Sequence, residues 1–507
     1  MTHSFHLLSK YLLLKFPTHL AFTLCLSLLL LVGCSPSEKS TVTNESIIRV
    51  NATCQVYDPI RPWLKRPPIS RQAIGTILSN NRILVTAEMV TNATYIELEK
   101  PVSAAKSSAQ VEFIDYESNL ALLKADDADF LNKSKPLEID LGTKSGDDVE
   151  VWQLEDNDSL ARTVGKVNTV EVGPYPEGFG RFLVYRLNLS LQYRDNAATL
   201  PVVRNNKLVG LLFRYDGRNQ NGAVIAAPVI AHFLKDAADG AYEGFPRIGL
   251  GFSSLRDPQL RSYAKKPEDV TGIYVNKVVK GGPGDLGGLQ EGDVLARVGG
   301  QDLDPDGNYI DPLYGKTSLE HLVSGKNYVG DTLTLSVYRD GKLLEKKVKL
   351  SRKNADDFLS PPYTYDKAPN YVVYGGLVFL ELSRTLLKTF GNDWVSTAPQ
   401  KLVYIDAFQD ELYPDEKRRI IIIGQVLPTD GTLSYGNLSG SVITKINGVE
   451  IKELSDINKG IIARAGGMDE LQLDDDPSVI YLDPLVVSME TDKLQKDFGI
   501  PALERLK

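Results

Sequence analysis

Residues 248–252 read Ile-Gly-Leu-Gly-Phe and could bind an anion through the backbone. Glycine adopts backbone angles that other residues avoid, so consecutive N–H groups in such a stretch can face one carboxylate. A peptide C-terminus held there could add as a strand beside the residues that follow. The predicted peptide-binding residues are Gly249, Leu250, Gly251 and Phe252. The alternative is that this loop serves only packing or contacts between copies of the chain.

Three carboxylates, Asp302, Asp304 and Asp306, alternate along the chain with the spacing of calcium ligands. The full calcium-loop pattern fails, because its twelfth position holds Leu313 and the flanks do not read as paired helices. We expect a structural turn here, with a calcium site as the weaker alternative. The sequence contains no zinc spacing, phosphate loop or dinucleotide fingerprint, and we expect no cofactor.

The first 33 residues have the features of a secretory signal. Lys10 and Lys15 precede an apolar run over 20–32, which ends in Gly33 and Cys34. This ending resembles a bacterial lipobox, so we expect a lipoprotein signal peptide over 1–33, lipid on Cys34 and a polar tether over 34–45. The alternatives are an ordinary signal peptide and a single anchor helix.

Histidine and cysteine are scarce in the remaining chain. Of five His, three lie in the signal segment, which leaves His232 in a predicted helix and His321 in another, where we expect it to be exposed. Cys54 is the one cysteine left after Cys25 is removed and Cys34 is acylated, so no internal disulfide is expected.

The composition is that of a folded protein, with 42% hydrophobic and 24% charged residues in a chain of 507. A chain of this length typically folds into about three domains. The net charge of -8 argues against a nucleic-acid partner, because phosphate binding needs a basic face.

The elements that position these residues fall into three units. Over 46–240, short strand-like runs separated by turns predict a sandwich or barrel, closed by a helix over 228–238. Over 245–353, strands at 272–279 and 332–338, a helix at 318–324 and an Asp-Gly hairpin at 339–341 are predicted. A third unit over 362–500 repeats part of the second, since 440–447 parallels 292–299.

Several motifs resemble the HtrA/Deg serine protease family. Residues 81–90 (NRILVTAEMV) match a family motif that carries the catalytic His, and Glu88 stands at that position. Asn119 precedes a Leu-Ala-Leu-Leu run where the family has Asp, and Ala197 in 195–199 (DNAAT) takes the place of the nucleophilic Ser. The resemblance implies a mostly β fold with minor α: a trypsin-like double β-barrel followed by two PDZ-like α+β domains.

Serine-type acyl transfer needs a hydroxyl, an imidazole and a carboxylate. Because Glu88, Asn119 and Ala197 replace all three, we expect a degenerate serine endopeptidase that is not an enzyme. The alternative is an active serine-type endopeptidase in envelope protein quality control with a divergent site, for example one that uses Thr199.

The resemblance also implies partners. We expect an envelope adaptor, chaperone-like module or regulatory scaffold that binds peptides or protein C-termini through its PDZ domains. In the third unit, residues 374–379 take the place of the binding loop, and we expect this domain to be structural. A homo-oligomer (trimer or higher) or an assembly with an active paralogue is implied. The lipid would hold the chain to the bacterial envelope, facing the periplasm and sorted to the outer membrane.

Overall fold

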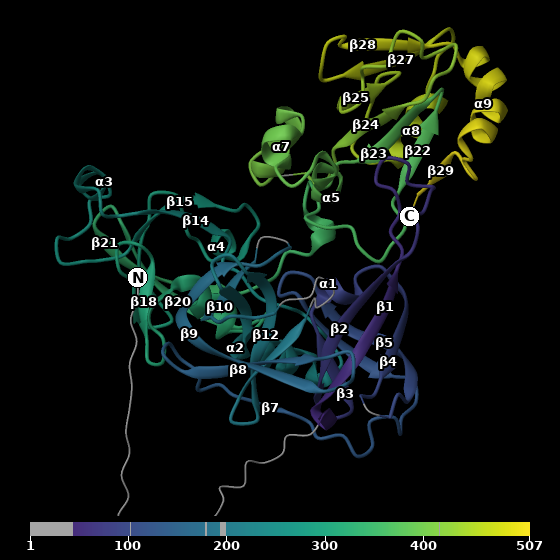
Figure 1. Cartoon of the computed structure of the whole chain (residues 1–507). Coiled ribbons are helices and arrows are strands. Elements are labelled where there is room, and N and C mark those ends of the chain that lie inside the picture. Colours follow the sequence, from purple (N-terminus) through teal and green to yellow (C-terminus); the bar gives the residue numbers. More distant parts are fainter. Residues whose placement is uncertain (1–43, 102, 178–179, 193–198, 415, 507) are drawn as a thin grey trace, which may run out of the picture. The chain divides into compact units, whose positions relative to one another are not determined.

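The structure is a computed structural model that describes residues 44–506 apart from 102, 178–179, 193–198 and 415 (Figure 1). Cys34 and Ala197 therefore lie outside the described residues. Among the helices in the described part of the chain, none has the length and apolar character needed to cross a membrane.

The first six strands close into a barrel in the order β1-β2-β3-β6-β5-β4. Alternate residues of β1 fill its interior, namely Ile48, Val50, Ala52 and Cys54, as the two-residue period of a strand requires. A single turn of helix, α1 (Ala87–Val90), lies between β3 and β4. The strands are β1 (Ile47–Cys54), β2 (Ile69–Leu78), β3 (Arg82–Val85), β4 (Ala93–Glu99), β5 (Lys106–Asp115) and β6 (Leu120–Ala125).

A second ring of strands follows in the order β11-β8-β9-β10-β13-β12, and pairing of β12 with β11 closes it. Trp152, Tyr185 and Phe233 are fully buried in its core. The predicted trypsin-like double β-barrel is confirmed. The elements are β7 (Glu138–Ile139), β8 (Asp148–Leu154), β9 (Leu160–Pro174), β10 (Arg181–Asn188), β11 (Leu200–Arg204), β12 (Lys207–Asp216), β13 (Asn221–Ala226), α2 (Ala227–Asp236) and η2 (Ala237–Asp239).

Residues 246–350 fold around a sheet in the order β14-β15-β16-β20-β21. The predicted hairpin is present between β20 and β21, where Asp340 and Gly341 have φ of 48° and 78°, as a two-residue turn requires. The elements are β14 (Leu250–Ser254), α3 (Pro258–Tyr263), β15 (Ile273–Val278), α4 (Pro283–Leu286), β16 (Val294–Val298), β17 (Gln301–Asp302), β18 (Asn308–Asp311), β19 (Gly315–Ser318), η3 (His321–Gly325), β20 (Thr332–Arg339) and β21 (Lys342–Lys349).

Residues 360–504 contain two four-stranded sheets, β24-β23-β22-β29 and β26-β25-β27-β28. The mostly β fold with minor α is thus confirmed. The elements are β22 (Tyr371–Tyr374), β23 (Leu377–Glu381), α5 (Arg384–Leu387), η5 (Lys388–Phe390), α6 (Trp394–Thr397), α7 (Gln400–Ala407), β24 (Ile421–Val426), β25 (Ile443–Ile446), β26 (Val449–Glu450), α8 (Ser455–Ile462), β27 (Asp469–Leu473), β28 (Val479–Leu482), α9 (Pro484–Phe498) and β29 (Glu504–Arg505).

Candidate peptide-binding groove and barrel cleft

Strand β14 is the end strand of its sheet. It pairs with β15 on one side, with Leu250 opposite Val278. Among the described strands, none pairs with its other edge. An unpaired edge presents backbone N–H and C=O groups that can accept a further strand. β14 can therefore take up an extended peptide.

The loop that leads into β14 is held in one conformation from within the domain. Gly249 has a φ of 77°, an angle that glycine adopts without the steric cost that other residues meet. The carbonyl of Ile248 accepts a hydrogen bond from the Gly284 N–H at 2.7 Å, and the carbonyl of Gly249 accepts one from Val279 at 2.9 Å. The predicted binding loop is therefore placed at the start of the free edge.

One wall beside the free edge is apolar. Leu250 and Phe252 are partly buried and pack against the core cluster that contains Leu319 and Val323 of the helical turn over 319–325. These four side chains line one hollow. Gly251 differs, because a Cβ there would lie 3.0 Å from Asn276 Oδ1, beside β15. Of the predicted loop residues, Gly249, Leu250 and Phe252 thus line the groove, whereas Gly251 contributes backbone.

His321 is buried, with 4% of its surface exposed, so the prediction of an exposed helical histidine is wrong. Its ring packs so closely against Gly325 that a Cβ on that glycine would lie 2.3 Å from His321 Nδ1. Burial, together with the charge of Lys326, lowers the pKa of His321 to about 4. The neutral ring is a packing element of the helical turn.

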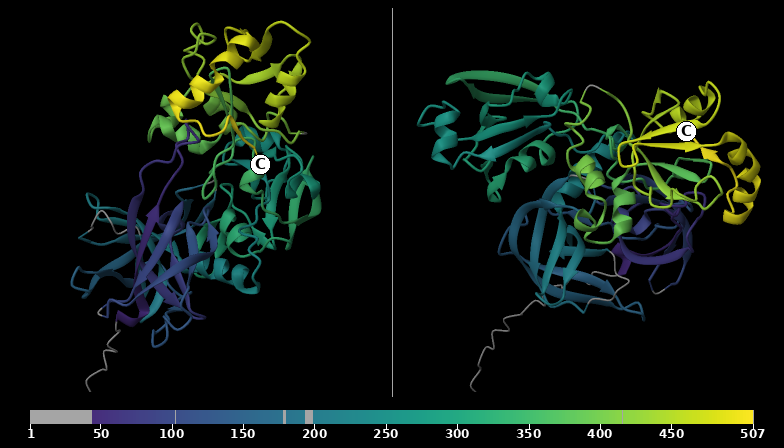
Figure 2. Two further views of the ribbon diagram at one scale, coloured as in Figure 1. Left: turned by 90° about the vertical axis from the view of Figure 1, so that its right-hand side faces the viewer. Right: turned by 90° about the horizontal axis from the view of Figure 1, so that it is seen from above.

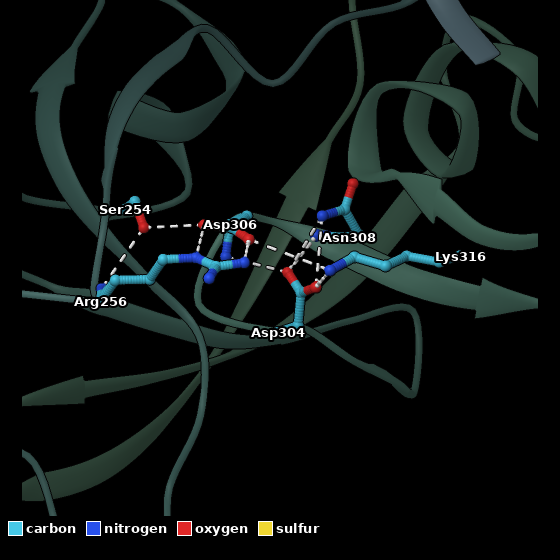
Figure 3. Close-up of polar contacts among 6 residues, drawn as sticks. All are labelled: Ser254, Arg256, Asp304, Asp306, Asn308 and Lys316. Carbon is cyan, nitrogen blue, oxygen red and sulfur yellow. Dashed lines mark hydrogen bonds and ion pairs between the residues drawn. The ribbon is translucent and has the colours of Figure 1, made fainter.

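The three alternating carboxylates all face cations. Figure 3 shows Asp304 beside Lys316, whose Nζ lies 2.6 Å from Asp304 Oδ2, and Asp306 beside Arg256, whose Nε lies 2.7 Å from Asp306 Oδ1. Asp302 pairs with Arg297. The hydrogen bond from Arg256 lowers the pKa of Asp306 to about 2.

The stretch from Asp302 to Gly307 is a turn between β17 and β18, and its carboxylates are neutralised by the protein's own cations. In the described part of the chain, no three His, Cys, Asp or Glu side chains are grouped so that they could hold a metal ion.

Glu88 and Asn119 lie side by side at the start of α1. Asn119 Oδ1 accepts a hydrogen bond from the Glu88 N–H at 3.0 Å, and the Asn119 carbonyl accepts one from the Ala87 N–H at 3.1 Å. Asn119 is 2% exposed and has a φ of 54°. It therefore satisfies two N–H groups that the first turn of a helix leaves free. The two residues that the motifs place at catalytic positions of the family are therefore neighbours in the structure.

The carboxyl group of Glu88 titrates near neutral pH. Burial raises its pKa to about 7, although the charges of Arg71 and Arg214 oppose the shift, and the charge of Glu177 adds to it. Arg71 also donates hydrogen bonds to the carbonyls of Glu88 and Thr91, the second at 3.2 Å. A carboxyl group with such a pKa can take or give a proton at neutral pH. No motif pointed to Arg71 and Arg214, which lie on other strands, β2 and β12.

Thr199 is fully buried, and its hydroxyl group is hydrogen-bonded to a neighbouring threonine. Its Oγ1 lies 2.5 Å from Thr86 Oγ1 and accepts a hydrogen bond from the Thr86 N–H at 3.3 Å. A nucleophile must reach the substrate carbonyl, and this hydroxyl is shielded from solvent. Ala197, the third of the triad-equivalent positions, lies outside the described residues.

In the second of the two C-terminal domains, the corresponding strand has no free edge. β23 pairs with β24 on one side and with β22 on the other. Gly375 and Gly376, with φ of 57° and 90°, join β22 to β23 as a two-residue hairpin turn. The residues expected to take the place of a binding loop thus form a hairpin whose first strand covers the edge.

Comparisons with known proteins place these domains. Residues 246–350 and 360–504 each match a family of PDZ domains. The chain is 26% identical over 451 residues to "Protease Do-like 4, mitochondrial" of Arabidopsis thaliana, covering 87% of this chain and 82% of that protein. It is 24% identical to "Protease Do-like 2, chloroplastic" of the same plant, covering 81% and 66%. A solved structure, "HtrA-type protease AlgW with decapeptide", is 17% identical with a TM-score of 0.47, covering 62% and 97%.

The names of these relatives correct one prediction. Proteins that align with most of this chain are named proteases, which points to a protease. The prediction that the chain is a degenerate serine endopeptidase and not an enzyme is therefore wrong.

Proposed function

The chain belongs to the HtrA/Deg (Do-like) serine protease family, and on that premise we propose that its first PDZ domain captures peptides or protein C-termini. The observation that carries this proposal is the free edge of β14 beside the Gly249 loop. A captured segment adds to β14 as a strand, and its main chain takes up the unpaired hydrogen-bonding groups of that edge.

The lining of the groove also favours certain side chains of the bound peptide. The hollow lined by Leu250, Phe252, Leu319 and Val323 suits an apolar side chain of the ligand. Full burial of a Val, Leu or Phe side chain is worth about 1.5–3 kcal/mol, which is enough to select for apolar residues at one position. The glycine at the loop allows neighbouring N–H groups to face a terminal carboxylate.

The biological role that we propose is that of an envelope adaptor, chaperone-like module or regulatory scaffold. The chain would work as a homo-oligomer, trimer or larger, or together with a paralogue. Cys34 would carry lipid and hold the chain to a bacterial membrane, facing the periplasm; the residues before it support this. Cys34→Ala should release the protein from the membrane fraction, whereas Cys25→Ala in the same apolar segment should not. Equal release by both variants would count against lipidation.

Peptide binding is tested with two glycine variants of the purified chain. Gly249→Ala and Gly300→Ala both place a side chain at a positive φ, 77° and 81°, and neither Cβ would meet an atom closer than 3.4 Å. Only Gly249 lies at the groove. Fluorescence anisotropy with labelled peptides that end in an apolar residue should show about tenfold weaker binding for Gly249→Ala, a loss of about 1.4 kcal/mol. Unchanged binding by Gly249→Ala would refute the proposal.

A second function, cleavage of captured chains by the barrel cleft, is favoured by the names of the relatives and by a carboxyl group poised near neutral pH. Digestion of casein by the purified chain tests it. The combined variant Glu88→His, Asn119→Asp and Ala197→Ser runs alongside as the comparison. Cleavage by the unmodified chain that Glu88→Ala abolishes would support this function. If casein stays intact with the unmodified chain as well as with Glu88→Ala, this function is contradicted.

A further inference from the structure

A long loop of the first barrel reaches into the second PDZ domain. Residues 55–68 connect β1 to β2 and form a projection that we call the arm, drawn in purple beside β22 and β29 in Figure 1 and rising from the barrel in the left view of Figure 2. Trp63 on the arm is 7% exposed and belongs to the apolar cluster that contains Tyr371 and Ile500. A side chain of the barrel domain thus completes the core of a PDZ domain.

Polar contacts hold Trp63 in its position in the second PDZ domain. Its Nε1 donates a hydrogen bond to the Phe498 carbonyl at 3.1 Å, and its ring centroid lies 5.6 Å from that of Tyr371. Arg505 donates to the Pro62 carbonyl at 3.1 Å. Buried indole rings usually find such a partner for the N–H group. The arm is therefore held by apolar burial and by directed bonds together.

The arm is stiff from its tip to its base. Asp58 Oδ1 accepts hydrogen bonds from the N–H groups of Ile60 and Arg61, each at 2.9 Å. The Asp58 N–H donates to the Leu64 carbonyl at 2.9 Å, and the Arg66 N–H donates to the Val56 carbonyl at 2.9 Å. These bonds run across the arm and hold its two chain segments together.

The base of the arm adjoins α1. The Gln55 N–H donates to the Asn92 carbonyl at 2.9 Å, two residues beyond the end of the helix. At the other end of the arm, Arg71 on β2 donates to the carbonyls of Glu88 and Thr91. Residues at or just beyond the two ends of the arm thus hydrogen-bond to α1, which carries Glu88, or to the two residues that follow it.

We propose that Trp63 is a positioning residue, whose packing in the second PDZ domain holds α1, and with it Glu88, in place beside Asn119. The inference goes beyond peptide capture, because it concerns Glu88 and Asn119 of the first barrel and not the groove of the first PDZ domain. Peptide binding at β14 should be the same with and without Trp63, so the two proposals fail separately.

Hydrogen exchange of the full chain tests this coupling. Trp63→Ala removes the seated ring, and Leu64→Ala, at a neighbouring residue that is 38% exposed, is the matched control. Exchange over 87–92 should become about tenfold faster in Trp63→Ala, as expected for a locally weakened segment, and stay unchanged in Leu64→Ala. Trp63→Phe keeps an apolar ring without the N–H group and should restore most of the protection.

A pH profile separates positioning from a purely structural role. The stability of the chain should decline between pH 6 and 8 as Glu88 loses its proton, and Glu88→Gln should remove this decline. If α1 loosens, the carboxyl group of Glu88 becomes better solvated, so the decline should be smaller in Trp63→Ala. Faster exchange confined to 371–381, with 87–92 and the pH profile unchanged, would overturn the proposal. So would unchanged exchange in both segments. If Trp63→Ala does not fold, Arg505→Ala, which removes the bond to the Pro62 carbonyl, provides the same comparison.

Discussion

The two PDZ domains of this chain differ in one strand edge. In the first, the Arg247 backbone N–H donates a hydrogen bond to the Ser351 carbonyl at 3.0 Å. This bond directs the chain before β14 away from that strand and leaves its edge unpaired. In the second, Gly375 and Gly376 turn the preceding chain back along β23 as β22. The difference shows that a match to PDZ domains does not settle whether a groove is open. The path of the residues before the binding strand decides it.

The largest expected effect comes from breaking the hairpin that closes the second domain. A Cβ at Gly376 would lie 2.7 Å from the Leu427 carbonyl oxygen, and the φ there is 90°. Strain and overpacking together should lower the free energy of unfolding by about 2–4 kcal/mol in Gly376→Ala. Urea unfolding measures this loss, and Gly300→Ala, at a similar φ in open space, should lose less. Equal losses would show that the tight hairpin is not a point of close packing.

An intermediate effect is expected at the wall of the open groove. Leu250→Ala removes apolar surface beside the free edge of β14 and should weaken binding of a peptide with an apolar end by about 1–2 kcal/mol. Leu343 on β21 of the same sheet is 56% exposed, and Leu343→Ala is the control. Titrations followed by anisotropy give both affinities. The open-groove assignment fails if the two variants bind equally well.

The smallest expected effect concerns the barrel, which lies outside the two PDZ domains compared above. The pKa of Glu88 is raised to about 7 from its ordinary value of 4.5, so the folded state binds this proton more tightly than the unfolded chain. The resulting stability is present below pH 4.5 and is lost as the pH rises through 7. Glu88→Gln, which has no such titration, should remove a decline of about 1 kcal/mol between pH 6 and 8.

Thermal unfolding at several pH values measures this decline, with Glu291→Gln at an exposed carboxylate as the control. A pH profile of Glu88→Gln identical to that of the unmodified chain would contradict the raised pKa. Peptide binding at β14 should not follow this titration, because Glu88 lies in the other domain.

Local sequence patterns predicted much of the fold. The Asp340-Gly341 hairpin forms because both residues tolerate positive φ, and the apolar alternation in β1 fills the barrel interior. The glycine loop at Gly249 was also predictable, because it follows from a short motif that occupies a fixed place in its fold.

Features that depend on distant residues were not predictable. The burial of His321 follows from which side of the helical turn faces the core, and the turn is too short for its periodicity to tell. Gly375 and Gly376 suit a binding loop and a hairpin turn equally well, because both need positive φ. Trp63 packs against residues more than 300 positions later in the chain, a contact that no local pattern encodes.

The difference between the two PDZ domains is tested most directly by photo-crosslinking. A peptide with an apolar C-terminus and a photoreactive residue is bound to the purified chain and irradiated, and the modified residues are located by mass spectrometry. Adducts should appear along 249–255 and 319–323, which flank the free edge, and not along 377–381, where β22 covers the strand. Adducts concentrated on β23, with β14 unmodified, would contradict the assignment of the open groove to the first domain.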